Sequence, residues 1–334
     1  MPARPTISII IVNWNSKDFL RKCLTSFFTH CRSVPAEIIV VDGASFDGCG
    51  EMLASEFPSV VFIQSPDNVG FARANNLGAR SAQGKYLLLL NPDTLFSEDS
   101  IQIMLDGLES LPQAGAVGCR LLNADGTLQT TSIMTFPTIL NQVFDSEYLR
   151  SRFRDWKLWG VAALYAQPQR AAEVEVISGA CIFIRREVFE KVGGFSEQYF
   201  MYSEDVDLCR KIQQAGQPAY YHPGTSLIHY GGGSSDQAVS NFSTVMMRYS
   251  TCLYLQLNHG TAKAVAYRGA MALTALVRLL AIAPLGLFGN RIVRHASNSM
   301  KKWYAVLRWS LGLAAIRAVL PAGKSNGSAP ETVI

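Results

Sequence analysis

Residues 86–93 read Tyr-Leu-Leu-Leu-Leu-Asn-Pro-Asp, an unbroken apolar run that ends in an amide, a proline and a carboxylate. A continuous apolar run of this length is typical of a strand buried on both faces of a largely parallel sheet. The proline and the acid predict a turn directly after that strand. The stretch therefore indicates an α/β protein with polar side chains at the carboxyl end of a central strand.

Three more apolar runs precede this strand, and helical stretches separate them. The runs cover 7–12, 38–41 and 60–63, and the predicted helices cover 17–29, 48–56 and 71–82. This alternation predicts a doubly wound α/β fold, in which ligands bind beyond the carboxyl ends of the strands. Further along we expect a strand pair within 174–185, a short helix over 186–192, and a helix over 204–215 with Ser203 as its N-cap.

The chain is rich in apolar residues, and its charge is unevenly spread. Of 334 residues, 49% are hydrophobic and 17% are charged, whereas about 25% charged residues is usual for soluble domains. Residues 261–334 hold ten Lys or Arg and one acid, a net charge of +9, which leaves −5 for residues 1–260. The C-terminal region is therefore expected to have a different partner from the body.

The last third of the chain has a helical and markedly apolar pattern. The apolar stretch 269–289 is split by Arg278 and broken by Pro284, whereas a spanning helix needs about 20 uninterrupted apolar residues. Basic residues interleaved with Trp303 and Trp309 favour helices that lie in the bilayer interface, where they also meet anionic head groups. The alternative is a set of core helices with a solvated basic face.

The seven cysteines form no Cys-x-x-Cys pair, which favours reduced thiols in a cytosolic compartment. The N-terminal residues enter an apolar strand at once and lack the apolar core and cleavage site of a secretory signal. We therefore expect the active part of the protein to face the cytoplasm.

Asp42 directly follows the second apolar run and opens a turn that carries a second acid, Asp47. A carboxylate at this place can accept hydrogen bonds from a base N–H or a ribose hydroxyl, or it can merely cap the next helix. No Gly-x-Gly-x-x-Gly follows the first strand and no Walker lysine is present. The sequence therefore lacks the main motifs that would indicate a nicotinamide-binding site or a P-loop nucleotide site.

Asp93 and His229 are the candidate ligands of a divalent cation. A carboxylate after the strand 86–90 can hold Mg²⁺ or Mn²⁺, with diphosphate oxygens completing the coordination shell; the alternative is a Pro-Asp turn that only closes the strand. His229 precedes Tyr-Gly-Gly-Gly-Ser-Ser, whose backbone amides can cradle an anion beside a metal or phosphate contact. A surface histidine in a loop is the alternative there.

Glu204, Asp205 and Asp207 place three acids in the first turn of a predicted helix. The helix macrodipole favours acids there, but three in four positions exceed that preference. Their crowding beside the aromatic run 199–202 is expected to raise at least one carboxyl pKa. One of these carboxylates can then act as a general base.

Six short motifs occur in an order that is far more specific than any one of them. They are Ile-Ile-Ile-Val-Asn-Trp-Asn (9–15), Val-Asp-Gly-Ala-Ser-Phe-Asp-Gly (41–48), Asn-Val-Gly-Phe-Ala-Arg-Ala-Asn (68–75), Leu-Asn-Pro-Asp (90–93), Ser-Gly-Ala (178–180) and Glu-Asp-Val-Asp (204–207). Together they resemble the family 2 inverting glycosyltransferases of GT-A fold, over roughly residues 5–235. The likeness is greatest to bacterial rhamnosyltransferases that build cell-wall or surface polysaccharides.

The resemblance implies a role for each matching residue. Asp205 becomes the catalytic base, and Glu204 orients the acceptor. Asp93 becomes the metal ligand of the family's Asp-x-Asp motif, whose first acid is replaced here by Asn91, so His229 gains weight as a second contact to Mg²⁺ or Mn²⁺. Asp42 becomes a nucleobase contact in a nucleotide site that also includes Asn13, Trp14, Asn68, Arg73 and Asn91.

The resemblance also implies the reaction and the layout of the chain. A sugar, rhamnose by the likeness, passes from a dTDP- or UDP-sugar to a hydroxyl of a lipid-linked or other glycan acceptor, at the cytoplasmic face of the cell membrane. No nucleic-acid partner is expected. The expected regions are a GT-A domain over 1–236, a helical membrane-associating region over 237–323 that holds the protein peripherally or monotopically, and a flexible tail over 324–334.

Two other functions stay open from the sequence alone. One is a nucleotidyltransferase acting on sugar phosphates, which also needs a nucleotide pocket and a carboxylate-held cation. The other is a catalytically inactive membrane scaffold of the same fold, against which the three acids Asp42, Asp93 and Asp205 argue. A fold by itself does not decide among such functions.

Overall fold

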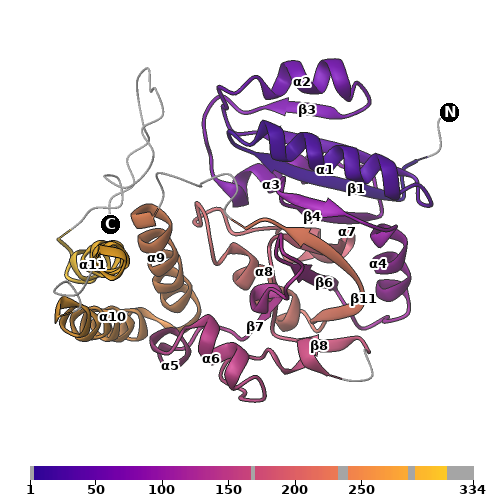
Figure 1. The fold of residues 1–334 in the computed structure, drawn as a ribbon. Coiled ribbons are helices and arrows are strands. Elements are labelled where there is room, and N and C mark those ends of the chain that lie inside the picture. The colour runs from indigo at the N-terminus through magenta and orange to yellow at the C-terminus, as the bar shows by residue number, and fades with distance from the viewer. Residues whose placement is uncertain (1–3, 167–169, 232–239, 285–289, 314–334) are drawn as a thin grey trace.

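The computed structural model describes residues 4–166, 170–231, 240–284 and 290–313, with backbone alone for 240–241 and 290–298. Helices cover both faces of a central sheet, and three long helices pack together beside it (Figure 1). The strand order in that sheet is β3-β2-β1-β4-β10-β6-β11-β5, and β8 pairs with β11. The predicted tail, 324–334, lies outside the described residues.

The first part of the chain forms the parallel half of the sheet. Its elements are β1 (Ile7–Asn13), α1 (Lys17–His30), β2 (Ala36–Asp42), α2 (Cys49–Glu56), β3 (Val61–Gln64), α3 (Phe71–Ser81) and β4 (Tyr86–Leu90). Each lies within two residues of its predicted bounds. Three of the four strands are mainly buried as expected, but β3 is an edge strand whose Val61 is 45% exposed. The prediction of burial on both faces is wrong for β3, because this strand lies at the edge of the described sheet, where its side chains are only partly covered.

The second part of the chain makes the sheet mixed rather than largely parallel. It contributes β5 (Thr94–Phe96), α4 (Ser100–Glu109), β6 (Ala116–Leu122), β10 (Cys181–Arg185), α7 (Arg186–Lys191), α8 (Glu204–Gln214) and β11 (Ala219–His229). β10 runs antiparallel to β4 and β6, whereas β11 runs parallel to β6 and antiparallel to β5.

Two strands, β9 (Val176–Ile177) and β10, do form within 174–185, but the prediction that they pair with each other is wrong. β8 (Ala172–Val174) pairs with β11, and β9 pairs with β7 (Ile133–Met134) in a separate small sheet. The partners of these strands lie about 40 residues or more away in sequence, so their pairing leaves no local pattern to read.

Helix α8 begins at the predicted residue, but without the side-chain cap that the sequence predicts. Tyr202 and Ser203 both have positive φ, 69° and 62°, and the Ser203 side chain makes no capping hydrogen bond. A capping serine normally has an extended backbone that brings its hydroxyl over the first turn. The expectation that Ser203 caps the helix with its side chain is therefore wrong, although its position at the N-terminus is confirmed.

Two hydrophobic clusters lie on the two faces of the sheet. On one face α1, α2 and α4 pack on side chains such as Ile9 and Leu88. On the other face α3, α7 and α8 pack on Ile10 and Leu89, and the same cluster continues without a break to Tyr254 in the C-terminal helices. Those helices are α9 (Ser240–His259), α10 (Thr261–Ile282) and α11 (Asn290–Ser310).

Between β6 and β8 the chain forms only short elements. They are η1 (Thr130–Ser132), β7, α5 (Ile139–Val143), α6 (Glu147–Arg152) and η2 (Ala162–Tyr165).

Of the described helices, α10 alone is long and apolar enough to cross a membrane, and 17% of its apolar window is buried inside the protein. Length and composition are weak support for a span, and α10 packs along α9 and α11 (Figure 1).

Candidate active site

The residues that the sequence singles out lie at one edge of the sheet. Asn13 and Asp42 are register partners at the ends of β1 and β2, and Leu90 ends β4 beside β1. Cys181 starts the antiparallel β10 opposite Leu90, and His229 ends β11, which runs in the direction of β4. The loops that carry Asp42, Asp93, the 178–180 turn and His229 therefore converge on this edge.

Asp42 is buried and held by a complete set of donors. Asn13 Nδ2 donates to Oδ1 at 2.8 Å, and Gln64 Nε2 donates to Oδ2 at 2.9 Å. Ser45 donates its backbone N–H and its hydroxyl, at 2.8 and 2.6 Å. The buried Oδ1 of Asn13 has no hydrogen-bond partner, so an acceptor is available beside a fixed carboxylate.

The other predicted nucleotide residues are less closely joined. The Asn68 carboxamide oxygen accepts from Gly70 N at 3.1 Å and lies near Gly43, which follows Asp42. Trp14 is partly buried after β1. Arg73 is half-exposed on α3, and its guanidinium lies 3.7 Å from the Glu197 carboxylate.

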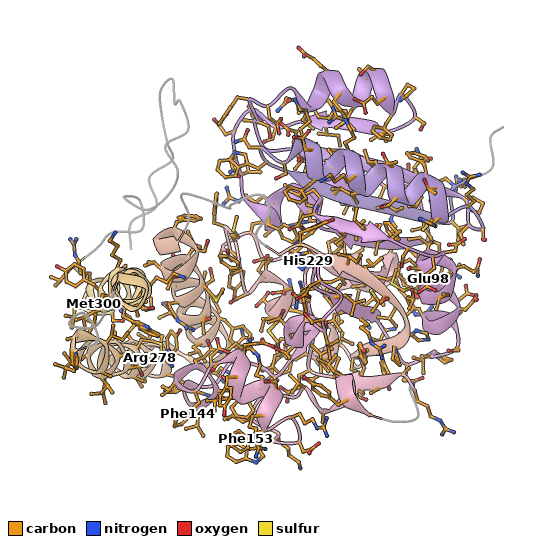
Figure 2. All side chains as sticks on the ribbon, in the orientation of Figure 1. Glu98, Phe144, Phe153, His229, Arg278 and Met300 are labelled. Atoms are coloured by element: carbon orange, nitrogen blue, oxygen red, sulfur yellow. The ribbon has the colours of Figure 1, made fainter. Side chains whose placement is uncertain are left out.

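His229 is oriented by Gln129, one hundred residues earlier in the chain. Gln129 Nε2 donates to the His229 carbonyl at 2.6 Å, which places Oε1 2.9 Å from His229 Nδ1. Nδ1 must then carry the proton in the neutral ring, so Nε2 carries the lone pair, which points away from Gln129. Nε2 lies 3.3 Å from Asp93 Oδ1 and 3.3 Å from Asn91 Nδ2, so three of the predicted residues meet around one ring nitrogen. Figure 2 labels His229 near the middle of the molecule.

This arrangement suits a cation that is held partly by its substrate. In the described part of the chain no group of three or more His, Cys, Asp or Glu could hold a metal by itself. Mg²⁺ commonly takes one or two carboxylates and completes its shell with water and phosphate oxygens. With the proton on Nδ1, the Nε2 lone pair accepts from Asn91 Nδ2 and also faces the Asp93 carboxylate, a repulsive contact that a cation between the two groups would relieve. Asp93 and His229 therefore fit such an ion, and the Asn91 amide nitrogen can donate to an anion beside it.

Asp205 is tied to the same edge through the 178–180 turn. Its Oδ2 accepts from Gly179 N at 2.9 Å and its Oδ1 from Val206 N at 2.9 Å. The neighbouring carbonyl of Ala180 accepts from Asn91 N at 3.0 Å. Burial raises the pKa of Asp205, and the amides of Gly179 and Val206 oppose that rise. The carboxylate is thus held by two amides and linked through one turn to the Asn91 loop.

Glu204 is the more deeply buried of the two acids. Burial, and next the charge of Asp205, raise the pKa of Glu204 well above its usual range. Its Oε2 has no hydrogen-bond partner. Of the two acids, Glu204 therefore holds its proton more readily, which agrees with the expected rise in pKa among these acids.

The third acid of the motif, Asp207, has a structural environment. Its carboxylate accepts from the Ser196 hydroxyl at 2.5 Å and from Asn258 Nδ2 at 3.5 Å. Lys211 Nζ lies 3.7 Å away, one turn along the helix. Asp207 therefore joins α8 to the preceding loop and to α9.

Three residues that contact the candidate site at the carboxyl ends of the strands were not predicted from the sequence. Ser45 has a local signal, since a serine three positions after an aspartate often bonds back to it in a turn. Gln64 and Gln129 have none, because their partners Asp42 and His229 are brought to them by the sheet. The predicted anion cradle in the glycine run after His229 falls largely on 232–235, outside the described residues.

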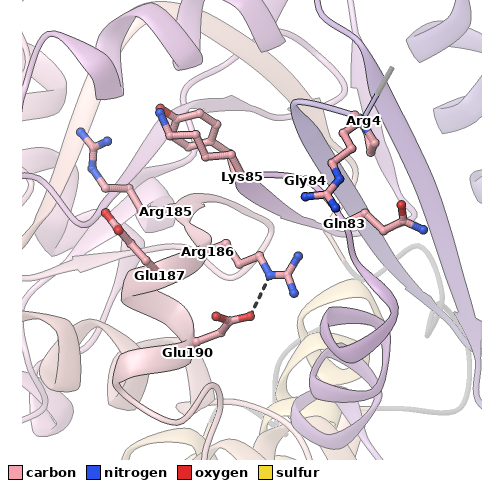
Figure 3. Close-up of a pocket in the computed structure, with 10 residues that line it drawn as sticks. Arg4, Gln83, Gly84, Lys85, Arg185, Arg186, Glu187 and Glu190 are labelled. Carbon is pink, nitrogen blue, oxygen red and sulfur yellow. Dashed lines mark hydrogen bonds and ion pairs between the residues drawn. The ribbon is translucent and has the colours of Figure 1, made fainter. Parts of the chain in front are cut away.

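A hollow of about 430 Å³ lies at the opposite edge of the sheet, beside the start of β4 (Figure 3). Arg185 donates from its guanidinium to the carbonyls of Ala114 and Leu108, and Arg186 pairs with Glu190 at 2.7 Å. These contacts account for Arg185, Arg186 and Glu190 without a ligand.

Known proteins match this chain in sequence and in fold. Residues 8–193 match the model of glycosyl transferase family 2. The chain is 26% identical over 241 residues to the N-acetylglucosaminyl-diphospho-decaprenol L-rhamnosyltransferase of Mycobacterium tuberculosis, covering 69% of this chain and 77% of that protein. It is 26% identical over 231 residues to the rhamnosyltransferase WbbL of Escherichia coli, covering 67% and 83%.

Among solved structures, the mannosyltransferase PcManGT from Pyrobaculum calidifontis, in complex with GDP-Man and Mn²⁺, is similar with a TM-score of 0.55 and 16% identity, covering 93% of this chain and 88% of that one. At that identity the likeness shows the fold alone, and it confirms the predicted GT-A arrangement of a sheet flanked by helices. The family model covers more than half of the chain, and the relatives named are rhamnosyltransferases. The chain belongs to glycosyl transferase family 2.

Proposed function

We propose that this glycosyltransferase moves rhamnose, with inversion, from a dTDP- or UDP-sugar to a hydroxyl of a lipid-linked glycan at the cytoplasmic face of the membrane. One observation carries the proposal: the contacts that join Asp205, through the 178–180 turn, to the Asn91 loop and His229. The names of the mycobacterial and Escherichia coli relatives support rhamnose, and the mycobacterial name supports a lipid-linked acceptor.

The donor nucleotide is assigned to the ends of β1 and β2. Asp42, held by four donors, offers a fixed carboxylate, and the unpartnered Asn13 Oδ1 offers an acceptor beside it. An N–H of the base or a ribose hydroxyl could donate directly to Asn13 Oδ1, whereas a contact with Asp42 would replace one of the four donors that it has now. Trp14, Asn68 and Arg73 are proposed to border the same nucleotide, with Arg73 exchanging its contact with Glu197 for the ligand.

The diphosphate is assigned to the Asn91 loop and His229. Asp93 and His229 Nε2 would hold Mg²⁺ or Mn²⁺, and the Asn91 carboxamide would face the same group. Bound there, the ion would neutralise the charge that grows on the departing diphosphate. Gln129 keeps the proton on Nδ1 and so leaves Nε2 free to act as a ligand.

Asp205 is assigned as the general base. It takes the proton from the acceptor hydroxyl while that oxygen bonds to the anomeric carbon, and the bond from that carbon to the diphosphate oxygen breaks on the opposite face. The pKa of Asp205, raised by burial, makes it a stronger base than an exposed aspartate. Glu204, which keeps its proton more readily, is proposed to orient the acceptor through a hydrogen bond.

Two neighbouring substitutions test the assignment of the base. Asp205→Asn should lower kcat by about 100- to 10,000-fold, the usual contribution of a general base. Glu204→Gln keeps the shape and the neutral state of its side chain and should cost far less. Near wild-type transfer by Asp205→Asn, with purified donor and acceptor, would remove Asp205 from this role.

The product identifies the reaction class. A panel of nucleotide sugars, assayed with and without Mn²⁺, should release nucleoside diphosphate, most rapidly from the rhamnose donor. Release of pyrophosphate would instead indicate nucleotidyl transfer. Activity that survives complete removal of divalent cations would contradict the proposed role of Asp93 and His229.

Membrane association through the C-terminal helices is part of the same proposal. The net charge of +9 in residues 261–334 and the apolar composition of α10 support it. An enzyme held at the bilayer would meet a lipid-linked acceptor at a high effective concentration.

A further inference from the structure

Helix α10 carries large apolar side chains on the side that faces away from the protein. Leu273, Val277 and Leu280 follow one another at helical spacing, and each is more than half exposed. The other side of α10, with Tyr267 and Met271, is buried where the helix packs on α9 and α11. A surface helix of a soluble protein normally turns its large apolar side chains inward, so this exposed side needs an apolar partner.

Two short elements of the catalytic part extend this surface. α5 contacts α10, and Arg248 of α9 donates to the Gln142 side chain of α5 at 3.3 Å. Phe144, directly after α5, is 48% exposed, and Tyr148 of α6 is 71% exposed. Figure 2 labels Phe144 and Arg278 where α5 meets α10. The exposed apolar side chains of α5, α6 and α10 therefore lie on neighbouring elements.

Helix α10 and its neighbour α11 carry basic side chains and no acid. The Arg278 guanidinium stacks on the Trp303 ring, 4.3 Å from its centroid, and Lys301 and Lys302 of α11 are exposed. The two acids at the start of α6 are both paired with Arg150. Apolar side chains bordered by basic and aromatic residues match the interface of a bilayer with anionic head groups, whereas a contact with a second copy would bring like charges together.

We infer that α5, α6 and the exposed side of α10 form one bilayer-binding surface, here called the α5–α10 face. Its occupant is the interface of a membrane that contains anionic lipid. The inference deepens the proposed membrane association, because it gives the catalytic part of the chain its own lipid contact. It does not depend on the transfer reaction or on the identity of the sugar.

The test is binding of the full-length protein to vesicles, measured by co-sedimentation without donor or acceptor. Vesicles of phosphatidylcholine with phosphatidylglycerol should bind wild type more strongly than phosphatidylcholine alone, and added salt should weaken that difference. Phe144→Ser and Tyr148→Ser should each lower the partition coefficient several-fold, to roughly tenfold, because each removes apolar surface from the membrane contact.

Val61→Ser is the matched control. Val61 lies on the edge strand β3, at the other end of the molecule from α5 (Figure 1), and its exposure of 45% is close to that of Phe144. The control should bind vesicles as wild type does, and equal melting temperatures of all variants would show that folding is intact.

Two outcomes would overturn the inference. One is unchanged vesicle binding in both Phe144→Ser and Tyr148→Ser. The other is a change in oligomeric state of the lipid-free protein with unchanged vesicle binding, which would make the face a contact between copies. Neither outcome bears on the chemistry, because sugar transfer to a soluble acceptor, assayed in parallel, tests the proposed function separately.

Discussion

Glu204 and Asp205 are adjacent in sequence and have different surroundings. Asp205 receives two backbone N–H groups, from Gly179 and Val206, whereas the buried Oε2 of Glu204 receives none. The same first helical turn thus keeps one carboxylate ionised more easily than the other. A difference in pKa between two neighbouring acids allows one to act as a base while the other stays protonated.

The protonation of Glu204 makes a prediction for stability against pH. Its pKa is raised above the unfolded value of 4.5 by burial first and by Asp205 next, so the folded state holds the proton to higher pH than the unfolded chain. This stabilising contribution is complete below pH 4.5 and is lost as pH rises through the folded pKa. Glu204→Gln removes that loss.

The Tm of Glu204→Gln minus that of wild type should therefore increase from pH 4.5 upward, reaching a few degrees at neutral pH. Thermal unfolding of both proteins across this range measures it. A difference that stays constant or shrinks as pH rises would mean that Glu204 ionises in the folded protein at least as readily as in the unfolded chain.

At the scale of elements, a backbone hydrogen bond joins the start of α3 to the loop before α8. Phe71 N donates to Phe200 O at 2.8 Å, and the preceding Gly70 has φ +83° and ψ 170°, a conformation that is nearly restricted to glycine. A Cβ on Gly70 would lie 2.4 Å from the Phe200 carbonyl oxygen. This contact joins the Asn68 loop to the chain that leads into Glu204 and Asp205.

A pair of glycine substitutions separates backbone strain from this contact. Gly126→Ala, at φ +79° with nothing within 4 Å of the added Cβ, should cost about 1–2 kcal/mol. Gly70→Ala adds a backbone clash and should cost about 3 kcal/mol or more. Urea unfolding gives both values, and equal losses would show that the loop moves away freely.

The elements also show how far a sequence can be read. The strand 86–90 is predicted to the residue because its apolar run is local and uninterrupted. The 130–165 region was not predicted, because η1, α5 and α6 are short and depend on distant contacts. The same limit applies to the site: Asp42, Asp93 and His229 stand out by their place after strands, whereas Gln129 matters only because the fold brings it to His229.

Across the whole molecule, all seven cysteines are buried and free, as the unpatterned spacing predicted. Burial raises the pKa of Cys23 and of Cys209 to about 12, so these thiols stay protonated at neutral pH. The thiolate is the reactive form. The native protein should therefore react with a thiol reagent very slowly, and all seven groups should react after unfolding in denaturant.

Counting modified thiols by mass measures this directly. Rapid modification of one or more cysteines in the native protein would show that a buried region opens readily. Reducing agent should leave the Tm unchanged, since no disulfide is present to be broken.

The continuous core described above bears on how this protein meets a membrane. Tyr254, Tyr267 and Trp309 belong to the same cluster as Ile10 of the central strand, and Asn258 of α9 contacts Asp207. The inner surfaces of the last helices are thus covered by the protein itself, so the proposed bilayer contact would involve their outer surfaces alone. Release from a bilayer would then require no unfolding of these helices, and the same folded molecule could exchange between membrane and water.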